Sequence, residues 1–276
     1  MKKIDFFGTR ISWICEKEQL KLIYKLVKNN IHAYITYSNV HVVVTGRKNL
    51  DLRNAINNAI IASPDGKPIS VVGRLKGAKC IEKCSGPDMM IKIIENGLQH
   101  GYRHYFYGGE EKTLKILKER LIESYPEIKI VGMYSPPFRE LTSDEEKKII
   151  EEINNARPDC IWVSLGAPKQ ELWMYRHKDC IKKGVMFGVG AAFNFLAKTQ
   201  KRAPVWMQKY GLEWFYRLIE EPRRLWKRYL TTNIFFIMYL LRFGVTIIDE
   251  PDEISFKKEN DCSYICYCGN KNNMIH

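Results

Sequence analysis

The sequence predicts an α/β fold: a Rossmann-like parallel sheet with helices on both faces, followed by a C-terminal helical appendage. Two observations support this prediction. Between residues 31 and 189, short apolar runs alternate with amphipathic helical patterns, which is typical of a parallel sheet covered on both sides. From Lys198 to Arg242 the chain becomes basic and aromatic. We therefore expect an α/β core over 1–196, an appendage over 197–245 and a polar, mobile tail over 246–276.

The apolar runs place the expected strands at residues 33–37, 59–62, 105–107, 129–132, 160–165 and 185–189. The expected helices lie between them, at 49–57, 87–100, 111–125, 143–156 and 169–182. The helix at 143–156 has the clearest start, because the Thr142 hydroxyl can cap it and Asp144 and Glu145 bring acids into its first turn.

The net charge of +13 over 276 residues is high for a globular chain. It suits a polyanionic partner such as nucleic acid, anionic lipid or a phosphorylated substrate, although codon bias toward lysine would also produce it. No long apolar run follows Met1, so we expect no signal peptide.

The eight cysteines predict reduced thiols in a cytosolic protein. Most of them are scattered, and only Cys262, Cys266 and Cys268 form a cluster. No second group of ligands accompanies that cluster, so we expect no metal site and no cofactor.

The appendage interleaves cations with aromatic side chains between Arg202 and Tyr229. A helix on an anionic membrane surface has this mixture, with aromatic rings at the headgroup boundary. The apolar run from Ile234 to Leu241 falls short of the roughly twenty apolar residues that a spanning helix needs. We therefore expect a helix that lies on the membrane surface or docks on the core.

Two strand ends carry candidate chemistry. Asp65 follows the apolar run at 59–62, and ligands of open α/β sheets bind beyond the carboxyl ends of strands. A carboxylate there could act as a general base toward a hydroxyl, although Pro-Asp-Gly is also a common turn. Lys169 and Gln170 begin the helix after the strand at 160–165 and would suit a sugar diphosphate, unless they only start an ordinary helix.

Gly108 and Gly109 form a glycine turn before a helix, where backbone N–H groups can bind phosphate. Glu110 and Glu111 would repel a phosphate on that first turn. The turn is not the GxGxxG fingerprint of dinucleotide-binding folds, which disfavours a nucleotide-dependent oxidoreductase.

Several blocks in order carry a family resemblance: 39–41 (NVH), 64–66 (PDG), 86–88 (GPD), 136–139 (PPFR), 165–171 (LGAPKQE), 189–193 (VGAAF), 202–204 (RAP), 211–214 (GLEW) and 221–224 (EPRR). Across residues 38 to 229 the chain resembles the WecG/TagA/CpsF family of bacterial glycosyltransferases. Blocks in a shared order are far more specific than any one of them.

The resemblance implies an inverting glycosyltransferase without an essential metal. It would move a sugar, with N-acetylmannosamine favoured, from a UDP-sugar to a polyprenyl-diphosphate-linked amino sugar in teichoic acid or other cell-surface polysaccharide synthesis. A UDP-glucose or uronic-acid donor is the alternative. The enzyme would be cytoplasmic and peripheral on the inner face of the cell membrane. A basic nucleic-acid-binding protein is the rival class, and the ordered blocks argue against nucleic acid as a partner.

The resemblance also implies roles for individual residues. Asp65 falls on the catalytic base. Asn39 falls on a pocket asparagine and Gln170 on a pocket glutamine. Together with the strand-end residues and the positions that depart from the family, the expected substrate-binding set is Tyr37, Asn39, Lys83, Gly108, Gly109, Lys169, Gln170 and Asn194. The appendage arginines Arg217, Arg223, Arg224 and Arg228 would reach the diphosphate or the membrane.

The chain departs from the family pattern at four positions. Tyr37 replaces a common Thr, Asn194 a common Asp and Lys198 a common Gly. Lys83 replaces an Arg, which keeps the charge but loses the two-point fork. These departures affect the expected donor sugar more than the expected reaction.

Overall fold

The computed structural model describes residues 1–249 and confirms the predicted α/β fold. A six-stranded parallel sheet has the order β4-β3-β8-β7-β5-β6. Its strands are β3 (Ala33–Ser38), β4 (Ile61–Pro64), β5 (Arg103–Gly108), β6 (Lys129–Tyr134), β7 (Cys160–Ser164) and β8 (Val185–Gly188). Each expected strand is present, and β4 begins two residues later than expected.

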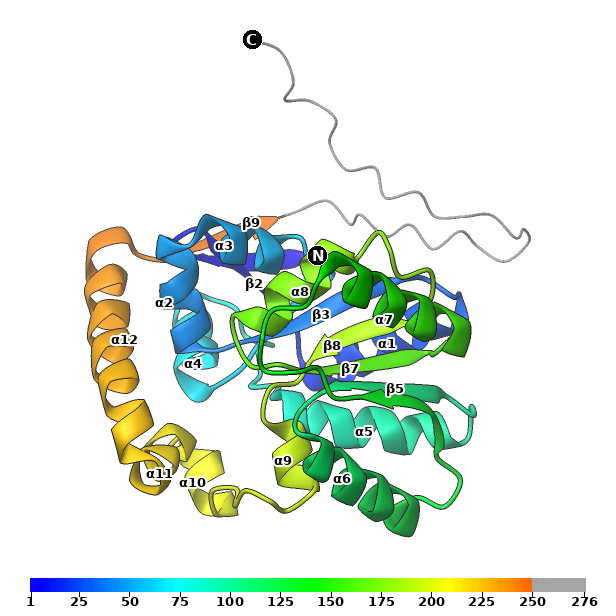
Figure 1. Ribbon diagram of the computed structural model, residues 1–276. Coiled ribbons are helices and arrows are strands. Elements are labelled where there is room, and N and C mark those ends of the chain that lie inside the picture. Colours follow the sequence, from blue (N-terminus) through cyan, green and yellow to red (C-terminus); the bar gives the residue numbers. More distant parts are fainter. Residues whose placement is uncertain (250–276) are drawn as a thin grey trace.

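Helices cover both faces of this sheet (Figure 1). One face carries α1 (Glu16–Lys28), α5 (Gly86–Leu98), α6 (Glu111–Ser124) and α9 (Ala192–Leu196). The other carries α3 (Leu50–Asn57), α7 (Ser143–Ala156) and α8 (Lys169–His177). The helix expected to reach residue 182 ends at His177 instead, because Cys180 and Ile181 both turn back to donate to the His177 carbonyl.

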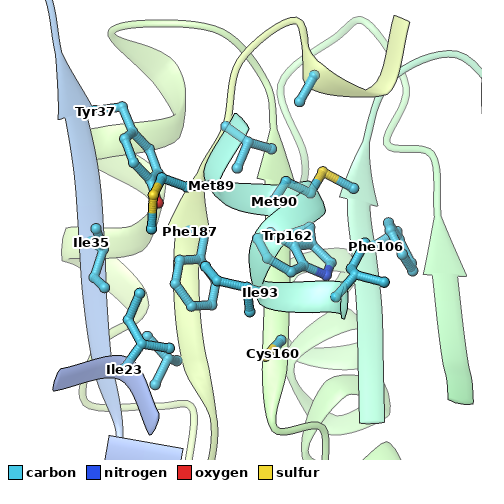
Figure 2. Close-up of a cluster of buried hydrophobic side chains, with 14 of the residues drawn as sticks. Ile23, Ile35, Tyr37, Met89, Met90, Ile93, Phe106, Cys160, Trp162 and Phe187 are labelled. Atoms are coloured by element: carbon cyan, nitrogen blue, oxygen red, sulfur yellow. The ribbon is translucent and has the colours of Figure 1, made fainter. Parts of the chain in front are cut away.

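The central strands are buried on both faces, which is why they read as continuous apolar runs. On β7, Trp162 points to the face that carries α5, whereas Ile161 and Val163 belong to the cluster on the other face. Figure 2 shows Trp162 beside Phe187, and the two rings stack with centroids 4.6 Å apart.

A second sheet joins the two ends of the described chain. It is antiparallel, with the order β2-β1-β9, and consists of β1 (Lys2–Phe6), β2 (Thr9–Ser12) and β9 (Thr246–Asp249). This sheet was not among the elements expected from the sequence. The expectation of a mobile tail from residue 246 is wrong for 246–249, because these residues pair with β1. The rest of that tail, with Cys262, Cys266 and Cys268, lies outside the described residues.

The appendage consists of α10 (Val205–Tyr210), α11 (Glu213–Glu220) and α12 (Pro222–Phe243), which follow one side of the core in Figure 1. The α12 helix packs against α2 (Val40–Lys48), beside α4 (Lys67–Leu75). Its Phe236 is 5% exposed and lies 6.3 Å from Phe6 and 5.9 Å from Phe7 between ring centroids. The appendage is therefore docked on the N-terminal strands, so the boundary expected at 196/197 does not separate two packing units.

Within residues 1–249, no helix has both the length and the apolar character needed to cross a bilayer.

Candidate active site

Asp65 lies at the carboxyl end of β4, beside the end of β3. Its backbone N–H donates to the Ser38 carbonyl at 3.0 Å, which fixes the turn to the neighbouring strand. Gly66 follows with a φ of +97°, a conformation open to glycine, and α4 begins directly after it. The Pro-Asp-Gly turn therefore places the Asp65 carboxylate at the ligand edge of the sheet.

Burial raises the pKa of Asp65 to about 6, and Lys83 is the main group that opposes this rise. Glu213 and Asp88 raise the pKa of Asp65 further, whereas Arg217 lowers it. A carboxylate with a pKa near neutrality is suited to general-base catalysis, because it is ionised at working pH and still basic enough to take a proton.

Charged side chains lie around Asp65, and four of them form one network of ion pairs. Lys83 Nζ lies 3.0 Å from Glu213 Oε2, and Arg202 Nε lies 3.6 Å from Glu213 Oε1. Arg202 also holds Asp88 at two points, at 2.6 and 2.9 Å. We call Asp65, Lys83, Asp88, Arg202, Glu213 and Arg217 the charged cluster.

The four predicted appendage arginines divide into two pairs. Arg217 and Arg228 are partly buried, and the Nε of each is buried without a hydrogen-bond partner among the described residues. Arg223 and Arg224 are exposed, and Arg224 pairs with Glu221 at 2.5 Å. The first pair therefore faces the core, and the second faces solvent.

His41 is half-buried and lies near Arg228. Burial, with a smaller contribution from Arg228, lowers the pKa of His41 to about 4. The imidazole is therefore neutral at pH 7, and its buried Nδ1 has no hydrogen-bond partner within residues 1–249.

Gln170 holds the turn after β8. Its Nε2 donates to the Gly188 carbonyl at 2.8 Å and to Glu171 Oε1 at 2.9 Å, and its Oε1 accepts from the Gly190 N–H at 3.0 Å. The side chain is 3% exposed. Both amide hydrogens are thus committed inside the protein, which favours a positioning role for Gln170 over direct substrate contact. Lys169 beside it is exposed at the start of α8.

Tyr37 belongs to the core, contrary to the expected substrate contact. The residue is 5% exposed, and Figure 2 shows it beside Met89. Its hydroxyl accepts from Gln19 Nε2 at 3.2 Å, and Gln19 Oε1 accepts from Ser63 at 2.8 Å. The Tyr37 hydroxyl is therefore hydrogen-bonded inside the core and does not reach the ligand edge of the sheet.

The glycine turn at Gly108 and Gly109 lets the end of β5 lie close to the end of β7 at Ser164. Gly108 has a φ of +112°, and a side chain there would meet the Ser164 carbonyl oxygen at 2.5 Å. The Gly109 N–H already donates to that carbonyl at 3.1 Å. This N–H is thus not available to a phosphate, and the expected phosphate contact through it is not supported.

Asn39 and Asn194 lie at neighbouring strand ends. Asn39 caps α2 by accepting from the Val42 N–H at 3.2 Å, and its Nδ2 makes no hydrogen bond within residues 1–249. Asn194 lies on α9, after β8, and is half-buried. Both side chains keep donors that a substrate could use.

Four residues of the site were not expected from the sequence: His41, Asp88, Arg202 and Glu213. All four stand inside the blocks that carry the resemblance, which was the available signal. Their pairing was not visible, because Arg202 and Asp88 are 114 residues apart. Within residues 1–249, no three His, Cys, Asp or Glu side chains gather as metal ligands.

The site combines a carboxylate of near-neutral pKa with lysine and arginine side chains at the carboxyl edge of a Rossmann-like sheet. This arrangement suits a transferase that activates a hydroxyl while a phosphorylated group leaves. A sequence profile of the Glycosyl transferase WecG/TagA/CpsF family matches residues 4–247. The chain belongs to this family and is a glycosyltransferase.

Three relatives share the name N-acetylglucosaminyldiphosphoundecaprenol N-acetyl-beta-D-mannosaminyltransferase. The protein from Bacillus subtilis (strain 168) is 29% identical over 81% of this chain and 82% of its own length. That from Bacillus spizizenii is 27% identical over 73% and 76%, respectively. That from Staphylococcus aureus (strain MW2) is 24% identical over 80% and 84%.

Proposed function

We propose that this enzyme transfers N-acetylmannosamine from a UDP-sugar, with inversion, to undecaprenyl-diphosphate-linked N-acetylglucosamine. The observation that carries this proposal is the position of Asp65, whose pKa is raised to about 6 beside Lys83 and Arg217. The names of the relatives support the acceptor and the transferred sugar. Family membership supports a nucleotide-sugar donor.

In this proposal Asp65 takes the proton of the acceptor hydroxyl. The hydroxyl oxygen attacks the anomeric carbon of the donor, the bond from that carbon to the diphosphate oxygen breaks, and UDP leaves with the electron pair. Lys83 and Arg217 stabilise the charge that develops on the diphosphate. Gln170 keeps the Gly190 turn in place, and Asn39 and Asn194 offer polar contacts to the sugars.

We further propose that the appendage holds the enzyme on the inner face of the cell membrane. Large apolar side chains are exposed along α10 to α12, among them Trp206 at 57%, Trp226 at 55% and Ile237 at 58%. The exposed Arg223 and Arg224 lie near the start of the same α12 surface. Aromatic rings with cations beside them match an anionic headgroup layer, where a lipid-linked acceptor resides.

A donor screen tests the reaction. The full chain would be incubated with a synthetic lipid-diphosphate-linked N-acetylglucosamine and, in turn, UDP-N-acetylmannosamine, its uronic acid, UDP-N-acetylglucosamine and UDP-glucose. Mass spectrometry should show one added N-acetylhexosamine with UDP-N-acetylmannosamine. Transfer from another donor only would contradict the proposed sugar. No transfer together with salt-sensitive binding of DNA or RNA on filters would contradict the proposed reaction.

Liposome flotation tests the membrane contact. The protein should float with vesicles that contain anionic lipid and much less with neutral vesicles. Trp226→Ala should reduce flotation, whereas Ile122→Ala, which removes a 46%-exposed side chain from α6, should not. Equal flotation of the two variants would contradict the assignment of this surface.

A further inference from the structure

Glu213 places a carboxylate from the appendage inside the charged cluster. The residue begins α11, and its side chain is 22% exposed. One oxygen lies 3.0 Å from Lys83 Nζ and the other 3.6 Å from Arg202 Nε. Glu213 thus bridges two cations next to Asp65, one of which is Lys83, our proposed ligand of the leaving diphosphate.

The formal charges of the six side chains in the charged cluster cancel one another. Asp65, Asp88 and Glu213 contribute three negative charges, and Lys83, Arg202 and Arg217 contribute three positive charges, which sum to zero. A neutral cluster gives little net attraction to a diphosphate, and the added anion would lie against three carboxylates. Binding is therefore favoured if one carboxylate moves away from the cations.

The contacts indicate which carboxylate can move. Asp88 is held by both ends of the Arg202 guanidinium and by the Ser85 hydroxyl. Asp65 follows β4 directly and is tied through its backbone to Ser38. Glu213 makes one hydrogen bond, with Lys83, and one longer ion pair, with Arg202, and it belongs to the appendage. Rotation of the Glu213 side chain would break fewer bonds than rotation of Asp88, which would lose three, and it leaves the proposed base Asp65 in place.

The same helix face offers a replacement charge. Arg217 lies four residues after Glu213, so both side chains project from one side of α11. The Arg217 guanidinium lies 5.8 Å from the centre of the Phe195 ring, and its Nε is buried without a hydrogen-bond partner within residues 1–249. Once Glu213 has moved, α11 presents a cation to the site, and Lys83 is free to bind an anion.

We propose that Glu213 is an internal anion that occupies the diphosphate subsite of the substrate-free enzyme and is displaced when the nucleotide diphosphate binds. This inference rests on the proposed function for its ligand. The same competition should speed product release after transfer. As the Glu213 carboxylate returns to Lys83, it competes with bound UDP for the subsite.

Calorimetric titration of UDP and of inorganic pyrophosphate into the full chain tests this inference. Glu213→Gln removes the competing charge and should bind both ligands about three- to tenfold more tightly, the scale of a partly buried ion pair. Glu213→Asp keeps the charge on a shorter side chain and should give a smaller gain. Glu220→Gln, which alters an exposed acid of the same helix, should bind like the unchanged protein.

The outcomes separate this inference from the proposed function. Equal or weaker binding of UDP by a folded Glu213→Gln variant would overturn the inference and leave the donor unchanged. If the unchanged protein binds no UDP, the proposed donor is wrong. Pyrophosphate then still tests whether Glu213 competes for an anion subsite, because such a subsite predicts tighter binding by Glu213→Gln than by Glu220→Gln.

Discussion

Arg202 and Asp88 form a two-point ion pair, with Nη1 2.6 Å from Oδ1 and Nη2 2.9 Å from Oδ2. The pair ties α5 of the core to the segment that leads into α10. A planar guanidinium presents two parallel N–H groups that match the two carboxylate oxygens, whereas an ammonium group is a point charge without this fork. This contact therefore fixes where the appendage leaves the core, and it places Arg202 within reach of Glu213.

Arg202→Lys should weaken this junction even though the charge is kept. We expect a loss of about 1–2 kcal/mol in the free energy of unfolding, because one charge-assisted hydrogen bond to Asp88 is lost. Denaturant titration measures the loss. Lys201→Arg changes an exposed neighbour and serves as the control. Equal stability of Arg202→Lys and the unchanged protein would show that the second bond contributes nothing.

Asp65 should set the acidic limb of the pH–rate profile. A general base works in its ionised form, so kcat/KM should fall as the pH drops below about 6, the pKa to which burial raises this carboxyl. Asp65→Asn should reduce turnover by about 10²-fold or more and leave UDP affinity near that of the unchanged protein. Retained turnover in this variant would exclude Asp65 as the base.

The same carboxyl should limit stability at neutral pH. Its pKa rises from 3.8 to about 6 in the folded protein, so folding favours the protonated form. This stabilising contribution is complete below pH 3.8 and is lost as the pH rises through about 6. Asp65→Asn should therefore be more stable at pH 8 by on the order of 2 kcal/mol. Thermal unfolding at pH 4 and pH 8 would contradict this if the difference did not grow with pH.

Loss of the Gln170 side chain should lower stability, whereas loss of the Lys169 side chain should affect only UDP affinity. Gln170→Ala leaves the Gly188 carbonyl and the Gly190 N–H without their partner, at a cost of about 1–3 kcal/mol in stability. Lys169→Ala removes an exposed cation and should change stability by less than about 0.5 kcal/mol. Any effect of Lys169→Ala should appear in UDP affinity. Similar stability losses in both variants would contradict the positioning role of Gln170.

Lys198 occupies a backbone conformation that favours glycine. Its φ is +55°, directly after the last residue of α9 and its cap. Lys198→Gly should stabilise the protein by about 1 kcal/mol through relief of this strain, or roughly 2–4 °C in Tm. Lys201→Gly alters an exposed residue that does not have a positive φ, so it should gain nothing. An unchanged or lower Tm for Lys198→Gly would refute the strain.

The main sheet could be predicted because its strands are local apolar runs such as Cys160–Ser164, buried on both faces. The sheet β2-β1-β9 could not. The partner of Lys2 is Asp249, almost the full described length away, and no local pattern reports such a pairing. The α2 helix was also missed, because its valine-rich sequence has no helical period and packing decides its structure.

The part of the site that depends on local sequence, the position of Asp65, could be predicted. Asp65 follows a strand and precedes a glycine turn, and both features are visible in the sequence. The resemblance implied that Lys83 and Arg217 lie near the diphosphate, but it did not indicate the carboxylates Asp88 and Glu213 beside Asp65, and Glu213 reaches it from the appendage. Tyr37 was expected to contact the substrate, but β3 is buried on both faces and the Tyr37 ring packs in the core.

β1, the first strand, pairs with β9, the last strand of the described residues. β1 lies between β2 and β9, so one of its edges has no partner until residue 249 has been synthesised and α12 has docked on Phe6 and Phe7. An unpaired strand edge beside exposed phenylalanines is prone to association with other chains. A chain interrupted between α12 and β9 would leave this edge of β1 unpaired, and a chain interrupted before α12 would also lack the helix that bears the proposed membrane surface. The fold thus makes closure of the N-terminal sheet depend on synthesis through residue 249, after the helix of the proposed membrane surface has been made.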